Sequence, residues 1–154
     1  MRRKDREESY EFGLKVIDRC EYAVMAVATG EETPYCLPLS MVRVGETLYF
    51  HCALEGKKLD LLHQNPKVFL SFVSANEAAT DQFTTYFESA MVAGTAFEIA
   101  DEQEKIETLR ALCEKLTPDH MAQFDRAIEK GLKVTGVWGI RMELVTAKAK
   151  KYPK

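Results

Sequence analysis

The sequence predicts an α+β fold in a single domain spanning residues 1–154, built on a barrel of six mostly antiparallel strands with peripheral helices. The length of 154 residues fits one domain, on a prior of about 150 residues per domain. Six segments have the period or composition of strands, and several of them are joined by short turns, which favour antiparallel neighbours. A closed or nearly closed barrel would protect the edges of such strands.

The strands fall into two groups along the chain. The first three are separated by turns at 30–34 and at Gly45-Glu46, and these short connections predict an antiparallel meander. The segment 22–28 is apolar on both faces, which predicts burial on two sides. Gly94 marks a bulge or bend in a later strand. The expected strands are 22–28, 35–43, 47–52, 67–74, 88–100 and 134–145, with a loop over 75–85.

Capping signals and helical periodicity predict four helices. Asp5 and Glu8 have the spacing of a capping box before the first helix, and Asp101 and Glu104 have it before the third. Pro118 stands at the first position of the fourth helix, where proline is tolerated. The expected helices run from Asp5 to near Cys20, over 56–64 with a stop at Asn65-Pro66, from Asp101 to Leu116, and from Thr117 to Gly131.

Composition excludes several classes of protein. The net charge is 21 − 24 = −3, so the chain lacks the basic charge that usually marks a nucleic-acid binder. The longest apolar run, Ala23 to Ala28, is far shorter than the roughly 20 residues that cross a bilayer. No signal peptide follows the basic start. We therefore expect a cytoplasmic protein with no nucleic-acid or membrane partner.

Cysteine usage agrees with a reducing compartment. Cys20, Cys36, Cys52 and Cys113 are widely spaced, and no C-x-x-C pair occurs. A chain of this length can build a core without disulfides, so we expect reduced and mostly buried thiols. His51 and Cys52 are adjacent, but neighbours on a strand point to opposite faces, so no zinc site is expected.

Residues 49–60 have the pattern of an anion site. A strand ends, a short loop with Gly56 follows, and a helix begins with Lys57 and Lys58. Lysines at a helix N-terminus oppose the helix dipole at a cost of a few tenths of a kcal/mol, and a bound anion would reverse that sign. A phosphate is the candidate anion, and two lysines that simply face solvent are the alternative interpretation.

Pro38 and Ser40 are unusual in an apolar strand. Proline removes a ladder donor, so Pro38 belongs at a sheet edge or beside a ligand. An ordinary edge strand is the alternative interpretation.

Together these motifs resemble the flavin-binding split barrel of the pyridoxamine 5′-phosphate oxidase-like superfamily, and within it the nitroimidazole-resistance protein family. The resemblance covers the chain from the first helix to Thr146. It is found in Pro38 and Ser40, the run Tyr49-Phe50-His51-Cys52-Ala53, Gly56-Lys57-Lys58, Asn65-Pro66, the run Phe83-Thr84-Thr85-Tyr86-Phe87-Glu88-Ser89, Gly94, Glu104-Lys105-Ile106 and residues 111–118.

The resemblance implies a homodimer with FMN at two interface sites. It implies that Lys58, with Lys57 beside it, binds the phosphate, and that Ser89 contacts the cofactor of the other subunit. It also implies that the backbone of Leu37, Pro38, Leu39 and Ser40 lines the isoalloxazine, and that Phe50 and His51 lie along the ribityl chain or ring. Cys52 would then lie beside the flavin, where we expect a small buried residue, with a redox-active thiol as the alternative.

His51 is the candidate catalytic residue. An imidazole could hydrogen-bond the flavin or protonate a substrate during its reduction. A histidine with only a structural hydrogen bond is the alternative. We expect His63 and His120 to face solvent, and Trp138 to lie in a core or interface.

The predicted function is an FMN-dependent oxidoreductase that reduces a small acceptor such as a nitroaromatic, nitroimidazole or quinone. Residues 75–82 are a candidate for the substrate side of the pocket. Two alternatives stay open at this point: a non-catalytic module that stores or senses flavin or binds haem, and a barrel that has lost its cofactor.

Overall fold

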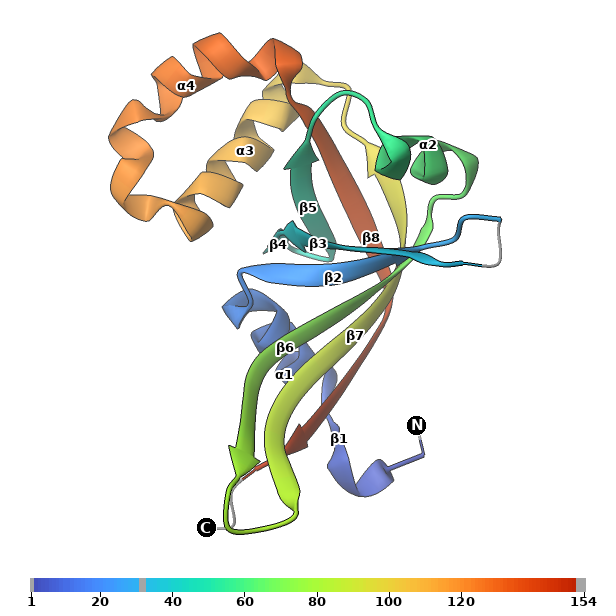
Figure 1. Cartoon of the computed structure of the whole chain (residues 1–154). Helices are drawn as coiled ribbons and strands as arrows, with labels where there is room; N and C mark the ends of the chain where they lie inside the picture. Colours follow the sequence, from blue (N-terminus) through green and yellow to red (C-terminus); the bar gives the residue numbers. More distant parts are fainter. Residues whose placement is uncertain (1, 31–32, 152–154) are drawn as a thin grey trace.

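The strands form one curled antiparallel sheet, and helices pack against parts of it (Figure 1). The computed structural model describes residues 2–30 and 33–151, so residues 31 and 32 of the predicted turn at 30–34 lie outside it. The strands are β1 (Glu7–Glu8), β2 (Tyr22–Val27), β3 (Tyr35–Ser40), β4 (Val42–Val44), β5 (Thr47–Cys52), β6 (Lys67–Ala79), β7 (Thr84–Glu98) and β8 (Gly136–Lys150). The α-helices are α1 (Tyr10–Arg19), α2 (Lys57–Gln64), α3 (Glu102–Leu116) and α4 (Phe124–Gly131), and short 3₁₀ turns lie at Lys4–Arg6, Pro118–Gln123 and Leu132–Val134.

The α+β class is confirmed, but the described residues form eight strands where six were predicted. The predicted strand 35–43 is interrupted at Met41, whose side chain is buried and whose N–H donates to the carbonyl of Glu21. That interruption separates β3 from β4. The two-residue β1 is the other addition, and it pairs with β8.

The antiparallel pairings predicted for the first three strands are confirmed, because β2 pairs with β3 and β4 pairs with β5, but the continuous meander is wrong. The strand order is β3-β2-β6-β7-β8-β5-β4, so the β2–β3 and β4–β5 hairpins extend opposite ends of the sheet. The long strands β6, β7 and β8 form its middle. The sheet curls enough for β3 to contact β5, although no ladder joins β3 to β4 within the described ranges.

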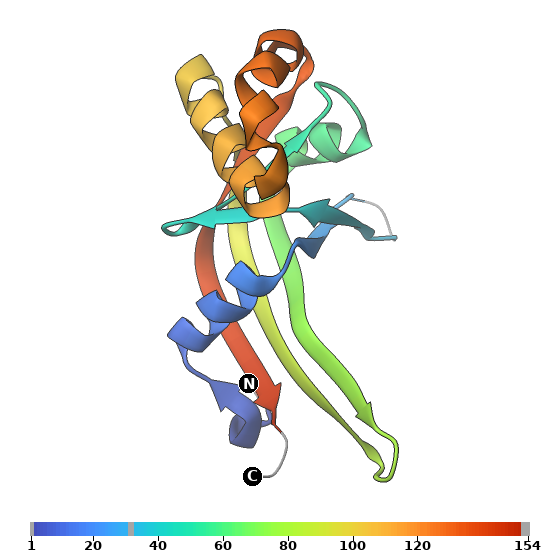
Figure 2. The ribbon, with the colours of Figure 1, turned by 90° about the vertical axis from the view of Figure 1, so that its left-hand side faces the viewer.

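The predicted loop over 75–85 is a continuation of the β6–β7 ladder. After a bulge between Val73 and Ala75, pairing runs from Ala75↔Glu88 to Ala79↔Thr84. Small and polar residues lower strand propensity, but pairing with a long neighbouring strand overrides it here. The hairpin therefore projects beyond the helices (Figure 2). The bulge predicted at Gly94 is confirmed by a register shift between Ala93 and Gly94 against β8.

Helix α1 covers the inner face of β6, β7 and β8. A Cβ added at Gly13 would lie 3.0 Å from a methyl group of Val145, so the helix backbone approaches the sheet closely. Ser9 caps the helix by accepting a hydrogen bond from the N–H of Phe12. The capping box predicted at Asp5 and Glu8 is therefore wrong, because Glu8 belongs to β1. The cap predicted at Asp101 is confirmed, since its carboxylate accepts from the N–H of Glu104.

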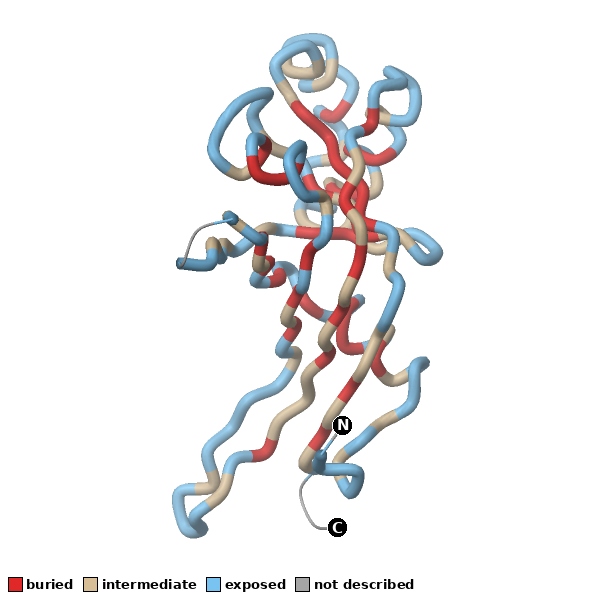
Figure 3. Tube along the Cα trace, turned by 90° about the vertical axis from the view of Figure 1, so that its right-hand side faces the viewer, coloured by how far each residue is buried: buried red, intermediate tan, exposed pale blue. Residues whose placement is uncertain are grey.

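Two hydrophobic clusters lie on opposite faces of β5 and β8. The larger one contains Phe50 and Trp138 with α1 and α2, and the smaller one contains Val137 with α3 and α4. The first five residues of β8 are all buried, and they contribute Val137 to the smaller cluster and Trp138 and Ile140 to the larger one. Buried residues form long red stretches along the middle of the molecule in Figure 3. Lys115 links the helical layer to the sheet, because its amine donates to the carbonyls of Cys20 and Met41 at 2.6 and 3.0 Å. Burial lowers the pKa of this amine.

The other face of the sheet is apolar and uncovered in the single chain. We define this outer face by Tyr22, Val24, Phe69, Val73 and Leu144, which are 41–60% exposed and share one side of the ladder. The prediction that the first strand is buried on both sides is wrong for the single chain. Its residues alternate, and only Ala23, Met25 and Val27 are buried.

Replacing Gly94 with alanine should destabilise the fold. The new Cβ would lie 2.5 Å from the carbonyl oxygen of Arg141, a backbone atom that cannot move without disturbing the β7–β8 ladder. Overpacking of this kind costs about 1–3 kcal/mol. Chemical denaturation measures the effect, and Gly131→Ala is the control, because its new Cβ would have no neighbour closer than 4.0 Å. Equal stability of the two variants would contradict the assigned register.

Candidate functional site

The N-terminus of α2 has no side-chain cap. Gly56 is its N-cap with φ of 133°, a conformation that L side chains rarely adopt, and no side chain caps the helix. The N–H groups of Leu59 and Asp60 bond back to the carbonyl of Gly56, at 2.8 and 3.2 Å. The N–H groups that precede them have no helical acceptor. A Cβ at Gly56 would meet nothing within 4 Å, so the space before the helix is free.

Two lysines stand at this open end. The ammonium of Lys57 lies 5.3 Å from the ring centroid of Tyr35, and that of Lys58 lies 5.2 Å from the ring centroid of Phe50. Neither lysine has an ion pair with an acid in the described part of the chain. Their charge adds to the partial positive charge of the helix end. We call this group, formed by Gly56, Lys57, Lys58, Tyr35 and Phe50, the cationic cradle.

Strand β3 begins at the cradle. It is an end strand that pairs only with β2, so the expectation that Pro38 lies at a sheet edge is confirmed. Leu37 and Leu39 pack partly buried against the core, whereas Pro38 and Ser40 are exposed on the outer face. The second edge of β3 therefore presents backbone groups without a ladder partner among the described residues.

The side chains of Phe50, His51 and Cys52 alternate between the two faces of strand β5. Phe50 is fully buried, and Cys52 packs half-buried against the same cluster. His51 is exposed on the opposite face, where it lines a pocket formed with α3 and α4. The structure thus brings Phe50 to Lys58 but turns the imidazole of His51 away from them.

The surroundings of Cys52 disfavour the ionised form of its thiol. Burial raises its pKa, and the charge of nearby Lys58 opposes that rise only in part. A raised pKa lowers the fraction of thiolate, the reactive form of cysteine, at neutral pH.

All four cysteines are free, and Cys36 is exposed, contrary to the expectation of mostly buried thiols. In the described part of the chain, no three His, Cys, Asp or Glu side chains form a group that could hold a metal ion.

Ser89 lies apart from the cradle within one chain. It pairs with Val73 and Lys148, whereas Tyr35 pairs with Val27 at the far end of the β2–β3 hairpin. Its side chain belongs to the same face as Met91 and Ala93, which is the outer face. Ser89 can therefore reach a site only across that face.

Sequence reasoning missed one aromatic residue of the cradle, Tyr35, and one property of a second aromatic residue, Trp138. Tyr35 faces Lys57, and its only signal was its place at the start of the strand that carries Pro38. Trp138 was predicted as a core aromatic and is 2% exposed, but its indole N–H is buried without an acceptor among the described residues. Its ring centroid lies 5.2 Å from that of His63 on α2. His63 and His120 are exposed, as predicted.

Comparison with known proteins identifies the family. The model of the pyridoxamine 5′-phosphate oxidase family matches residues 9–149. The chain therefore belongs to the pyridoxamine 5′-phosphate oxidase family, as its sequence motifs indicated. No curated protein matches the sequence.

Solved structures share the fold. A candidate 5-nitroimidazole antibiotic resistance protein from Bacteroides thetaiotaomicron has 24% identity and a TM-score of 0.77, over 94% of this chain and 89% of the other. The flavocytochrome Anf3 from Azotobacter vinelandii has 22% identity and a TM-score of 0.80, over 94% and 69%. A FAD- and heme-binding protein from Mycobacterium smegmatis has 20% identity and a TM-score of 0.81, over 97% and 76%. At these identities the likeness establishes the fold. None of the described helices is long and apolar enough to cross a membrane.

Proposed function

We propose that the protein is an FMN-binding oxidoreductase that reduces a small organic acceptor such as a nitroaromatic, nitroimidazole or quinone. The observation that supports it most is the cationic cradle, in which two lysines without acidic partners stand at an uncapped helix end. Four of the similar solved structures are named for FAD or heme binding or as a flavocytochrome. Membership of the pyridoxamine 5′-phosphate oxidase family agrees with a flavin.

The cradle residues fit the phosphate of FMN. The free N–H groups at the start of α2 suit an anion, and Lys58 supplies a charge that the ring of Phe50 holds in place. Lys57, against Tyr35, supplies a second charge. The open edge of β3 at Leu37, Pro38, Leu39 and Ser40 offers backbone groups to the isoalloxazine, in keeping with a split barrel.

Bound FMN supplies two-electron redox chemistry, with electrons taken from a reduced nicotinamide or another donor and passed to the acceptor. In this proposal the chain orients the ring and excludes water. The imidazole of His51 faces the pocket on the opposite side of β5 from the cradle, so its proposed role is to give a proton to an acceptor and not to contact the phosphate end of FMN. It has no hydrogen bond or ion pair with any described residue, so its imidazole is available for this role.

We also propose that the protein is a homodimer formed through the outer face. Exposed apolar patches of this kind mark protein interfaces. Two copies joined there would cover Val24 and Phe69, and would bring Ser89 of one subunit toward the cofactor of the other. The burial of the first strand on both sides, predicted from its sequence, would then hold in the dimer.

Replacing Lys58 with alanine should weaken FMN binding about tenfold to a hundredfold, because a hydrogen bond to a charged group contributes about 1.5–3 kcal/mol. Fluorescence titration measures the affinity. Riboflavin, which lacks the phosphate, should bind wild type and variant equally. Lys130→Ala, on the exposed side of α4, is the matched control. Unchanged FMN affinity in Lys58→Ala would refute the phosphate assignment, and FAD titrated in parallel decides between the two flavins.

Replacing His51 with alanine should lower turnover about 10²- to 10⁴-fold, the usual contribution of a general acid, while FMN stays bound. Steady-state reduction of a nitroaromatic by the FMN-loaded protein measures this. His120→Ala removes another exposed imidazole and should have no effect. Full activity of the His51→Ala variant would contradict a catalytic role for His51 and would leave it only a structural one.

Replacing Phe69 with glutamate should yield a monomer, because the charge would be buried in the interface without a partner. Size-exclusion chromatography with light scattering gives the mass. Val134→Glu changes a side chain that is 68% exposed outside the outer face, and this control should stay dimeric. A monomeric wild type, or a dimeric Phe69→Glu, would refute this interface.

A further inference from the structure

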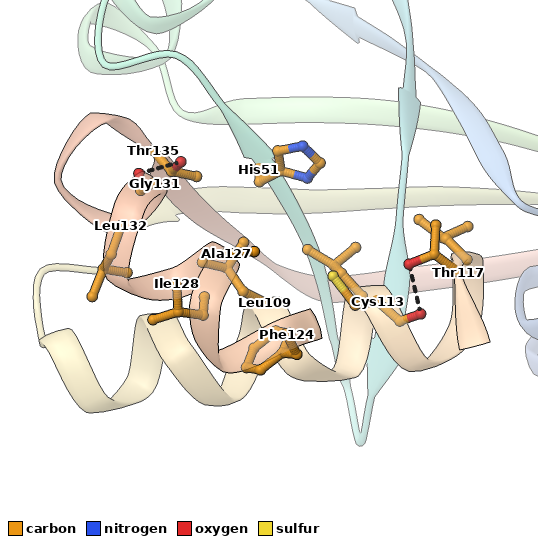
Figure 4. A pocket seen from close by; sticks show the side chains of 12 residues that line it. His51, Leu109, Cys113, Thr117, Phe124, Ala127, Ile128, Gly131, Leu132 and Thr135 are labelled. Carbon is orange, nitrogen blue, oxygen red and sulfur yellow. Dashed lines mark hydrogen bonds between the residues drawn. The ribbon is translucent and has the colours of Figure 1, made fainter. Parts of the chain in front are cut away.

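The pocket beside His51 is a cavity of about 320 Å³ between β5, α3 and α4 (Figure 4). Leu109 and Leu112 of α3 line one side, and Phe124 and Ile128 of α4 line another. His51 lies across the pocket from Phe124. A volume of this size is at the lower end of the range for small-molecule sites.

Few polar groups reach this pocket. The hydroxyl of Thr117 donates to the carbonyl of Cys113, and that of Thr135 donates to the carbonyl of Gly131, so both hydrogens are already used. The Cys113 thiol is a weak donor. The imidazole of His51 has no partner among the described residues. The lining is therefore apolar, with one strong polar group at its edge.

This arrangement has the pattern of a ligand site. Binding pockets are mainly apolar, and a small number of polar groups fix the orientation of the ligand. An empty apolar space also leaves its lining without dispersion partners on one side, which an apolar ligand would restore. Filling the space therefore stabilises α3 against α4.

We propose that this pocket binds a small, mainly apolar organic molecule whose single hydrogen-bonding oxygen meets His51. The pocket and the cationic cradle lie on opposite faces of β5, because Phe50 and His51 alternate along that strand. The proposal goes beyond the proposed function and does not require the flavin. The lining carries no lysine or arginine, so the ligand needs no phosphate or other strong anion.

The test uses 2-naphthol, a neutral aromatic molecule with one hydroxyl, which has no charge to attract it to the cradle. Isothermal titration should give one site per chain. Ala127→Trp places a large ring in the pocket and should weaken binding at least tenfold. Ala122→Trp makes the same change at an exposed position that does not line the pocket, and should stay within twofold of wild type.

A second variant tests the polar contact. His51→Phe keeps an aromatic ring and removes the hydrogen bond, so it should weaken 2-naphthol binding about three- to tenfold, the range for one hydrogen bond. Circular dichroism verifies that each variant is folded. Absence of 2-naphthol binding to wild type, or equal binding to Ala127→Trp, would overturn the proposal.

FMN titration of the same proteins separates this proposal from the flavin proposal. Ala127→Trp should bind FMN as wild type does. If Ala127→Trp loses 2-naphthol binding and keeps its FMN affinity, the result supports the proposal that the pocket binds an apolar ligand. Naphthol binding by a wild type that refuses FMN would refute the proposed function and support the pocket.

Discussion

The alternation of side chains along β5 organises both candidate sites. Successive residues of a strand point to opposite faces, so Phe50 enters the core beneath α2 while His51 faces α3 and α4. Pairing with β8 holds β5 in this register from Thr47 to Cys52. A slip of one residue would exchange Phe50 and His51, and would remove the ring that faces Lys58. The cradle and the pocket therefore depend on the same ladder.

The cationic cradle is electrostatically unfavourable without a ligand. Lys57 and Lys58 oppose the dipole of α2, and no described acid pairs with either. The cost is small, because each such interaction near a helix end contributes only about 0.3–1 kcal/mol. The rings of Tyr35 and Phe50 offset part of it. A phosphate would convert both repulsions into attractions, so the same residues favour a loaded site.

Local signals in the sequence predicted the elements that build the cradle. Gly56 correctly predicted the start of α2, and Asn65-Pro66 correctly predicted its end. Pro38 correctly indicated an end strand. Gly94 identified the bulge, and Asp101 identified the start of α3. The caps at Gly56 and Asp101 and the stop at Asn65-Pro66 act within a few residues of their cause, so they can be predicted without the tertiary fold. Gly94 and Pro38 meet distant or absent strands, but the residue type alone indicated the irregularity.

Pairing between distant segments could not be predicted in the same way. The place of the β4–β5 hairpin, with β5 beside β8, depends on contacts across about 90 residues of chain, whereas the short connections predicted a continuous meander. The ladder over 75–79 forms because β7 is available as a partner, although its own residues are poor strand formers. The opposite orientation of Phe50 and His51 does follow from strand periodicity, but the pocket beside His51 required the positions of α3 and α4.

The visible absorption spectrum of the purified protein, after incubation with FMN and removal of free FMN by desalting, tests the central claim most directly. We expect a flavin spectrum with one FMN retained per chain, and two per dimer. A colourless protein after desalting would contradict it. A haem band in place of the flavin spectrum would also contradict it, and would favour a haem-binding module on the same fold.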